Sequence, residues 1–187
     1  MLLFLDVDGP LIPFGGPGPY PAHRPCPAQG SGRGTDEVHP LLSRLDPALG
    51  PRLLCLGCEL VWATTWLEDA NAVVAPWLGL PPLPVLEPPR TPAPSGPHWK
   101  TLPILDRAAG RPFVWVDDEI SAVDEDLVAD LHPAPALLHR VDHRHGLTDG
   151  DFEVVEEWLR ANAAPGPASA PSPPPPGCTR WRRGPAR

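Results

Sequence analysis

The chain has 187 residues, 42% hydrophobic and 20% charged, a composition that predicts one globular domain and excludes a wholly disordered chain. Its 31 prolines are several times the usual share, so many must lie in loops and tails. The net charge is −8, and the C-terminal segment holds arginines but no acid, so the preceding part is more acidic still. This charge argues against general DNA or RNA binding.

The N-terminus carries no targeting pattern. The apolar run over residues 1–5 ends at Asp6, which is too short for the core of a signal peptide, and no basic residue precedes it. No apolar stretch approaches the length of a membrane span. We therefore expect a cytoplasmic protein with no membrane partner.

The first predicted element is a buried strand over residues 2–6, an apolar run that ends in the turn Val7-Asp8-Gly9-Pro10. Glycine and proline are dense over residues 15–34, which predicts a loop. A helix is expected over residues 36–45, with a second short helix around residues 47–51.

A second strand is predicted over residues 59–65, again ending in polar residues. Apolar residues then recur at helical spacing over residues 66–78, which indicates an amphipathic helix. Residues 83–86 are a weaker strand candidate because prolines flank them closely. Residues 88–97 are expected to form a loop.

The rest of the folded part continues the alternation of helix and strand. We expect a helix over residues 98–109, a strand over residues 113–116, and then a helix whose buried face is Ile120, Val123, Leu127 and Leu131. A final strand is predicted over residues 136–141. The last helix begins near residue 149, capped by Thr148 and Asp151, with Phe152, Val155, Trp158 and Leu159 facing inward.

Strands that alternate with helices predict an α/β fold, namely a doubly wound, Rossmann-like parallel sheet of about five strands with helices on both faces. The domain is expected to span residues 1–163. Residues 164–187 are proline-rich and basic, and we expect them to be a disordered tail.

Polar residues follow three of the predicted strands, at the sheet edge where such folds gather their chemistry. They are Asp6 and Asp8, then Thr64 and Thr65, then Asp117 and Asp118. Taken singly, each pair has a structural explanation, because Asp-x-Asp-Gly is a common turn and Asp-Asp often caps a helix.

Together these groups favour a metal site. Four carboxylates that converge at one edge would repel one another, so the arrangement needs a cation, and hard oxygen ligands suit Mg²⁺. Lys100, at the start of a helix, could supply a further positive charge. Its alternative is an ordinary solvated helix lysine.

The four groups, in their order and spacing, resemble the four motifs of the haloacid dehalogenase superfamily. The residues are Asp6-Val7-Asp8-Gly9, Ala63-Thr64-Thr65, Lys100 and Val116-Asp117-Asp118-Glu119. The resemblance covers residues 1–159. It is greatest to the compact group related to the phosphatase-like domain of Swiss-army-knife RNA repair proteins.

The resemblance implies a Mg²⁺-dependent phosphatase that forms an aspartyl phosphate. It makes Asp6 the nucleophile and Asp8 the general acid and base, with Thr64 or Thr65 bound to the phosphoryl oxygens. It makes Lys100 a balancing charge, and it makes Asp117 and Asp118 metal ligands beside the Asp6 side chain and the Asp8 backbone carbonyl. Pro10 after the Asp-x-Asp-Gly departs from the family pattern, and the adjacent threonines leave the second motif's register open, with a slight preference for Thr64.

The segments over residues 9–35 and 81–98 are too short for a large cap domain, and by the resemblance an open site suits a large substrate, such as a phosphoprotein or a nucleic-acid end, or needs a partner as a lid. The acidic charge disfavours the nucleic-acid end, so we expect a phosphorylated substrate that is either a small molecule or the end of a macromolecule. Two alternatives remain: a binding module that keeps the fold without turnover, and a phosphotransferase or RNA end-processing enzyme. The oligomeric state and the natural substrate stay open.

Three weaker candidates stand outside the motifs. Cys55 and Cys58 form a lone CxxC that packing explains better than metal or redox chemistry. His139, His143 and His145 could form a metal cluster but are better explained as surface residues. Trp66 and Trp99 are neighbours of site residues in the sequence and could line the entrance.

Overall fold

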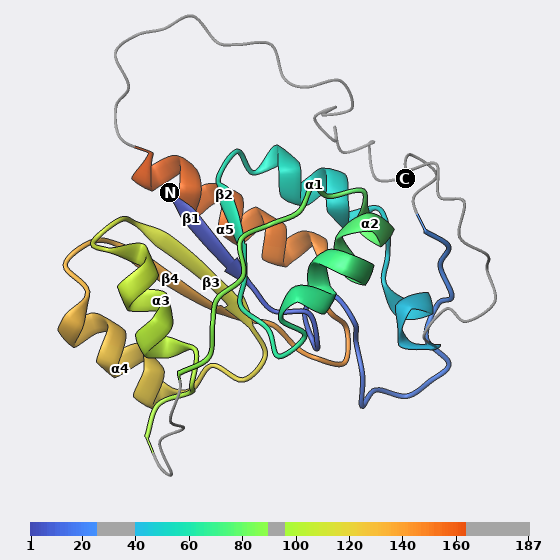
Figure 1. Cartoon of the computed structure of the whole chain (residues 1–187), viewed down its shortest axis with the longest axis horizontal. Helices are drawn as coiled ribbons and strands as arrows, with labels where there is room; N and C mark the ends of the chain where they lie inside the picture. The colour runs from blue at the N-terminus through green and yellow to red at the C-terminus, as the bar shows by residue number, and fades with distance from the viewer. Residues whose placement is uncertain (26–39, 90–95, 164–187) are drawn as a thin grey trace, which may run out of the picture.

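A computed structural model describes residues 1–25, 40–89 and 96–163, which form an α/β fold around a parallel sheet (Figure 1). Its strands are β1 (Leu2–Leu5), β2 (Glu59–Trp62), β3 (Phe113–Asp117) and β4 (Ala136–Arg140). The order across the sheet is β2-β1-β3-β4, and every neighbouring pair is parallel. The sheet of the described residues therefore has four strands, and the expectation of about five is wrong.

The missing strand is the proline-flanked segment over residues 83–86. It makes a single bridge to β2, in which the Trp62 amide donates to Pro84 O (2.8 Å) and the Leu86 amide donates to Trp62 O (2.7 Å). Pro82 and Pro84 have no N–H to donate, so the hydrogen-bonded ladder cannot extend into a regular strand.

Seven helical segments connect or follow the strands in the described part of the chain. They are η1 (Pro40–Arg44), α1 (Leu49–Cys55), η2 (Ala70–Val74), α2 (Ala75–Leu78), α3 (Thr101–Ala108), α4 (Ala122–Leu131) and α5 (Asp149–Asn162). The helix expected over residues 36–45 is a 3₁₀ helix at residues 40–44, and residues 36–39 lie outside the described part. The helix expected from residue 66 begins only after Leu67, because Leu67 adopts a left-handed φ of 48°.

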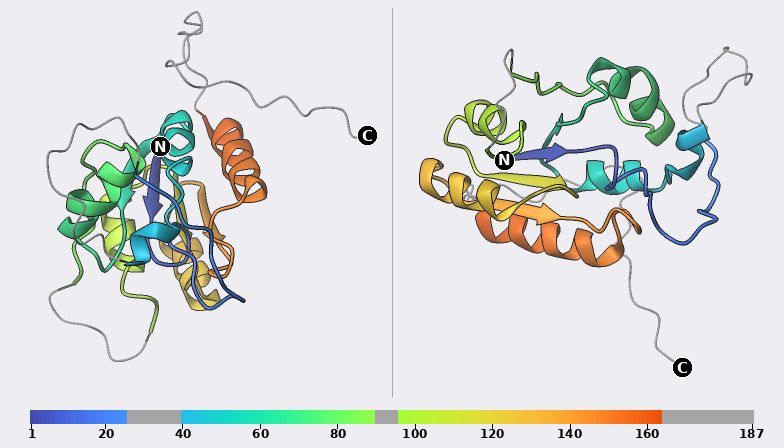
Figure 2. Two further views of the ribbon diagram at one scale, coloured as in Figure 1. Left: turned by 90° about the vertical axis from the view of Figure 1, so that its right-hand side faces the viewer. Right: turned by 90° about the horizontal axis from the view of Figure 1, so that it is seen from below.

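The helices cover both faces of the sheet. Leu3 and Leu5 of β1 point into a core shared with α1, η2, α2 and α5, whereas Leu2 and Phe4 point into a second core shared with α3 and α4. Strand β1 is apolar on both faces for this reason, as expected of a central parallel strand. Figure 2 shows α5, in orange, lying along β4.

The buried face of α4 differs from the predicted one. Val123 and Leu131 are 54% and 57% exposed, whereas Asp124 is fully buried and Val128 lies in the core. The spacing of apolar residues predicted the wrong inward face, because the Asp124 carboxylate occupies part of that face. This carboxylate accepts four hydrogen bonds. By contrast, the Thr148–Asp151 capping box of α5 is confirmed.

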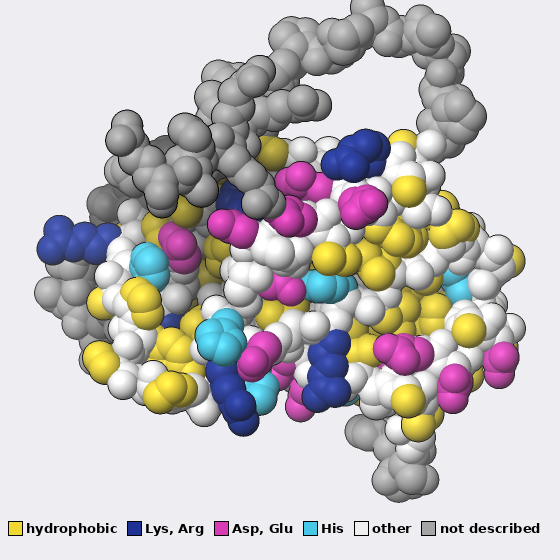
Figure 3. Space-filling view, turned by 180° about the vertical axis from the view of Figure 1, so that it is seen from behind, with side chains coloured by type: hydrophobic (Ala, Val, Ile, Leu, Met, Phe, Trp, Pro, Cys, Tyr) yellow, Lys and Arg dark blue, Asp and Glu magenta, His cyan; other side chains and the backbone are white. Residues whose placement is uncertain are grey.

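The described surface is mixed in charge. On the face seen in Figure 3, basic side chains lie singly among acidic, histidine and apolar ones. No helix among residues 1–25, 40–89 and 96–163 has both the length and the apolar character needed to span a membrane. The predicted tail over residues 164–187 lies outside the described residues.

Candidate active site

The three aspartates lie where the winding of the sheet reverses. Asp6 directly follows β1, Asp117 is the last residue of β3, and Asp118 comes next. The chain moves from β1 to β2 on one side and then returns past β1 to β3 on the other, so the crevice between β1 and β3 is the topological switch point. In open parallel sheets ligands bind at this position, beyond the carboxyl ends of the strands.

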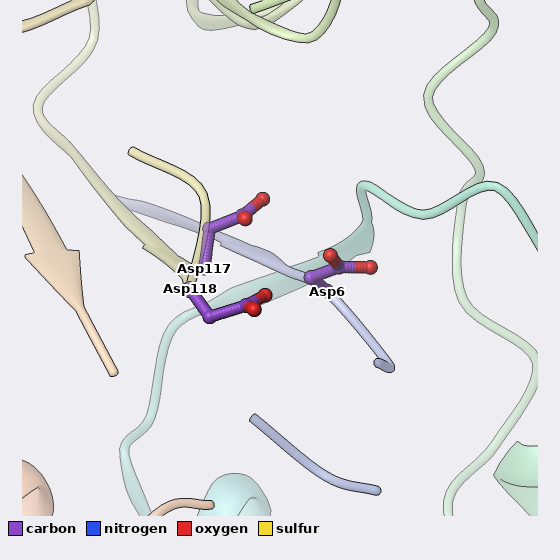
Figure 4. A group of neighbouring side chains, drawn as sticks. All are labelled: Asp6, Asp117 and Asp118. Atoms are coloured by element: carbon purple, nitrogen blue, oxygen red, sulfur yellow. The ribbon is translucent and has the colours of Figure 1, made fainter. Parts of the chain in front are cut away.

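The carboxylates of Asp6, Asp117 and Asp118 form one compact group. Each offers an oxygen atom, and these oxygens lie within 4.8 Å of one another (Figure 4). All three residues are buried, with exposed fractions of 6%, 0% and 8%. Three buried carboxylates at such distances need positive charge nearby.

Lys100 supplies part of that charge. It is the only lysine of the chain, and it is 1% exposed at the start of α3. Its Nζ donates to Oδ2 of Asp6 at 2.7 Å and to Oδ2 of Asp117 at 2.6 Å. The alternative of a solvated helix lysine is therefore wrong, because a lysine is almost never buried unless it is paired.

Further donors hold two of the carboxylates in place. Oδ1 of Asp6 accepts from the Val7 amide at 2.7 Å. Oδ1 of Asp117 accepts from the Glu119 amide at 2.9 Å, and its Oδ2 accepts from Nε1 of Trp115 at 3.0 Å. Asp118 differs: its carboxylate lies 3.9 Å from Nδ1 of His143, and within the described part it has no salt bridge to lysine or arginine.

The burial of the cluster shifts its titration. Burial raises the pKa of Asp6 to about 6, while Lys100 opposes the shift and the charge of Asp117 adds to it. Burial alone would lower the pKa of Lys100, but Asp6 and Asp117 outweigh it, so the pKa of Lys100 is raised. Burial and the neighbouring Asp117 raise the pKa of Asp118. When its three carboxylates are ionised, the cluster holds more negative charge than its one lysine neutralises.

Gly9 lets the loop after β1 pass directly against Asp118. Its φ is +84°, in the left-handed region, and a Cβ placed there would lie 2.5 Å from Cγ of Asp118. The glycine of the Asp-x-Asp-Gly sequence is thus required by both the turn and the close approach.

The second carboxylate of that sequence is placed differently from the first. Asp8 is half-buried, and its Oδ2 accepts from Nε1 of Trp66 at 2.9 Å. Thr64 is fully buried, with Oγ1 accepting from the Trp66 amide at 3.3 Å, whereas Thr65 is exposed. The structure thus distinguishes the two threonines by burial, while their predicted role at a phosphoryl group stays a prediction.

Asp124 is a supporting residue that the sequence analysis missed. Its Oδ1 accepts from the His98 amide (2.7 Å) and from Oγ1 of Thr101 (2.6 Å), on either side of Lys100. Its Oδ2 accepts from the amide and hydroxyl of Ser121, which forms the capping box of α4. The pattern Ser121-x-x-Asp124 is the signal that could have identified it.

The histidines that the sequence offered as weaker candidates each have a different partner in the structure. His139 pairs with Asp151 (2.8 Å), His145 pairs with Asp142 (3.1 Å), and His143 lies beside Asp118. The three histidines do not form a metal cluster, which agrees with the preferred explanation as surface residues, since the three aspartates are the only such group among residues 1–25, 40–89 and 96–163. Cys58 is a free, half-buried cysteine, and burial raises its pKa to about 11, which does not suit a reactive thiol.

Trp66 and Trp99 both lie near the cluster. The Trp66 indole contacts Asp8 as described above, and the Trp99 ring centroid lies 5.8 Å from Nζ of Lys100. Both side chains are half-buried, and their predicted place at an entrance to the site stays a prediction.

Comparison with known proteins adds no relative: no protein-family model, no curated protein and no solved structure matches the chain. The resemblance to the haloacid dehalogenase superfamily therefore stays a prediction. The function has to be argued from the geometry of the cluster.

Proposed function

We propose that this chain is a Mg²⁺-dependent phosphatase that hydrolyses phosphoric monoesters through an aspartyl phosphate on Asp6. The observation that carries the proposal is the buried cluster at the switch point, in which the only lysine bridges Asp6 and Asp117 while Asp118 lies beside them. Phosphoryl transfer draws most of its catalysis from positioning and from positive charge at the phosphoryl oxygens. A nucleophilic carboxylate beside a lysine and a cation site meets both needs.

The residues present fit a divalent cation. Three ionised carboxylates and one ammonium group leave about two negative charges unbalanced. Burial is the main cause of the raised pKa values of Asp6 and Asp118, and the charge of Asp117 adds to both shifts. Carboxylate oxygens are the ligands that Mg²⁺ prefers. Asp6, Asp117 and Asp118 would hold the ion, with the backbone carbonyl of Asp8. When bound, Mg²⁺ neutralises charge on the phosphoryl oxygens.

The side chains divide the remaining work. With a pKa of about 6, Asp6 is ionised at neutral pH and can attack phosphorus. Asp8 gives a proton to the leaving oxygen in the first step and takes one from water in the second. Lys100 keeps the nucleophile oriented and balances charge. Thr64 or Thr65 would donate to a phosphoryl oxygen.

The class of substrate is proposed from the segments that follow β1 and β2. The short segments after β1 and β2 are consistent with a site that lacks a large cap, and such a site accepts a phosphorylated small molecule or the end of a macromolecule. The acidic character of the chain disfavours general nucleic-acid binding. A cytoplasmic location remains part of the proposal.

A phosphate-release screen over varied phosphomonoesters tests the proposal. We expect Mg²⁺-dependent release that EDTA abolishes and added Mg²⁺ restores. Asp6→Asn should reduce the rate on the order of a thousandfold or more, because the amide cannot serve as the nucleophile.

Asp106→Asn is the matched control, since Asp106 is an exposed carboxylate on α3. It should leave the rate unchanged. Release by Asp6→Asn within severalfold of the wild type, or full activity in EDTA, would contradict the mechanism.

A further inference from the structure

Trp66 joins two loops that the sequence separates widely. It follows β2 and precedes η2, yet its indole Nε1 donates to Oδ2 of Asp8 in the loop after β1, at 2.9 Å. The position of Trp66 in the sequence indicates only that it is near the site. The hydrogen bond connects it with one particular carboxylate.

The loop that carries Trp66 is held by its own contacts. The Trp66 amide donates to Oγ1 of the buried Thr64, and its carbonyl accepts from the Asp69 amide at 3.0 Å. Leu67, the next residue, takes a left-handed φ of 48°, a conformation that strains any residue with a Cβ. The half-buried ring also packs against the core cluster that contains β1 and α5. These contacts fix the indole independently of Asp8.

The Asp8 carboxylate accepts fewer hydrogen bonds than the carboxylates of Asp6 and Asp117. Asp6 and Asp117 each accept two or three hydrogen bonds, including one from Lys100. Within the described part of the chain, the Trp66 indole is the only side chain hydrogen-bonded to the carboxylate of Asp8. The orientation of Asp8 therefore depends on Trp66.

We propose that Trp66 is a positioning residue for Asp8, and this inference rests on the proposed phosphatase function. The indole donates and cannot accept, so it favours Oδ2 as the carbonyl-type oxygen and leaves Oδ1 to carry the proton. An indole N–H does not titrate in the working range. It orients the acid without competing for the proton.

In both chemical steps, the proton that is transferred leaves or returns to Oδ1 of Asp8. As the bond between Asp6 and phosphorus forms, the bond from phosphorus to the leaving oxygen breaks, and the Asp8 proton moves to that oxygen to release an alcohol. A water molecule next attacks phosphorus and gives its proton to Asp8. The bond from phosphorus to Asp6 breaks, which yields phosphate and restores both carboxyl groups.

The test compares two phosphate monoesters in Trp66→Phe, which keeps a ring and removes the N–H. p-Nitrophenyl phosphate has a leaving group that needs little protonation, whereas an alkyl phosphate needs a full proton transfer. We expect kcat/KM on the alkyl ester to fall by about tenfold to a hundredfold. On p-nitrophenyl phosphate the fall should stay below about threefold, because acid catalysis contributes little there.

Trp77→Phe is the matched control, because Nε1 of Trp77 donates to Leu45 O at 2.9 Å inside the core and away from the cluster. It should lower the melting temperature without changing the ratio of the two kcat/KM values. If Trp66→Phe does not fold, Trp66→Met fills the space without a donor and is expected to give the same shift in the ratio.

If kcat/KM falls equally on both esters in a folded variant, the positioning role of Trp66 is overturned and the phosphatase proposal stays intact. A wild-type protein that hydrolyses neither these esters nor any in the wider screen would overturn the proposed function, and this inference with it.

Discussion

Gly9 is the residue at which the backbone itself determines the shape of the cluster. Gly9→Ala should lower the free energy of unfolding by about 3 kcal/mol or more, because it adds strain at φ +84° to a clash with Asp118. It should also weaken Mg²⁺ binding, since the Asp118 carboxylate must move. Urea unfolding and calorimetric titration measure the two effects.

Gly57→Ala measures the cost of backbone strain without a steric clash, and so serves as the control for Gly9→Ala. Gly57 also has a positive φ, of +66°, but a Cβ there meets nothing within 4 Å. Its substitution should cost about 1 kcal/mol and leave Mg²⁺ binding unchanged. Equal losses of stability and of Mg²⁺ affinity in the two variants would contradict the role assigned to Gly9.

The raised pKa of Asp6 predicts how the metal-free protein responds to pH. Asp6 ionises near its ordinary pKa of 3.8 in the unfolded chain but at about 6 in the folded one. Its contribution to stability is therefore fully present below about pH 3.8 and is lost as pH rises through about 6, a change of about 3 kcal/mol. Urea unfolding in EDTA at about pH 4 and pH 7 measures it.

Asp6→Asn is the reference for that measurement, because its amide does not titrate and the titrating groups that do not interact with Asp6 cancel in the difference. The stability of the wild type minus that of Asp6→Asn should fall between the two pH values. Adding Mg²⁺ at about pH 7 should restore the stability of the wild type but not that of Asp6→Asn. A difference that does not vary with pH would contradict the pKa assigned to Asp6.

At the scale of elements, Asp124 ties α3 to α4 and so positions Lys100. Asp124→Ala should reduce the free energy of unfolding by about 3 kcal/mol, because four donors lose a buried acceptor. Burial alone would raise the pKa of Asp124, but hydrogen bonds from Ser121 and Thr101 outweigh it and lower the pKa. Its contribution is present above about pH 3.8 and lost as pH falls below that value.

Asp126→Ala is the control on the same helix, since Asp126 is exposed. It should change the stability by less than about 0.5 kcal/mol. Chemical denaturation at neutral pH is the measurement, and equal small effects in the two variants would show that Asp124 does not brace the helices.

The elements also show what the sequence can and cannot predict. Apolar runs that end in polar residues predicted β1, β2 and β3, because a buried parallel strand is apolar on both faces. Strand β4 was also predicted, although it is only half-buried. The positions of Asp6, Asp117 and Asp118 at the carboxyl ends of predicted strands were enough to predict them as site residues. The buried face of α4 was missed because hydrophobic spacing cannot register a buried carboxylate, and the contact from Trp66 to Asp8 depends on a strained loop with no sequence signature.

At the scale of the whole molecule, residues 164–187 show no apolar residues at helical or strand spacing and contain none of the proposed site residues. Deleting residues 164–187 should therefore shift the melting temperature by less than about 2 °C and leave hydrolysis of a small phosphoester unchanged. Differential scanning calorimetry of both chain lengths checks this. A marked drop in melting temperature would show that the C-terminal segment, which contains Trp181, contributes to the fold.

The most direct test of the central claim is thermal protection by beryllium trifluoride or aluminium fluoride with Mg²⁺, because these anions imitate a phosphoryl group on a carboxylate. A hundredfold excess over the dissociation constant stabilises the native state by about 2.7 kcal/mol, so the melting temperature should rise by about 5 to 10 °C. The rise should vanish in Asp6→Asn and shrink in Lys100→Ala. An unchanged melting temperature with both fluorides at saturating Mg²⁺ would contradict a phosphoryl site at Asp6.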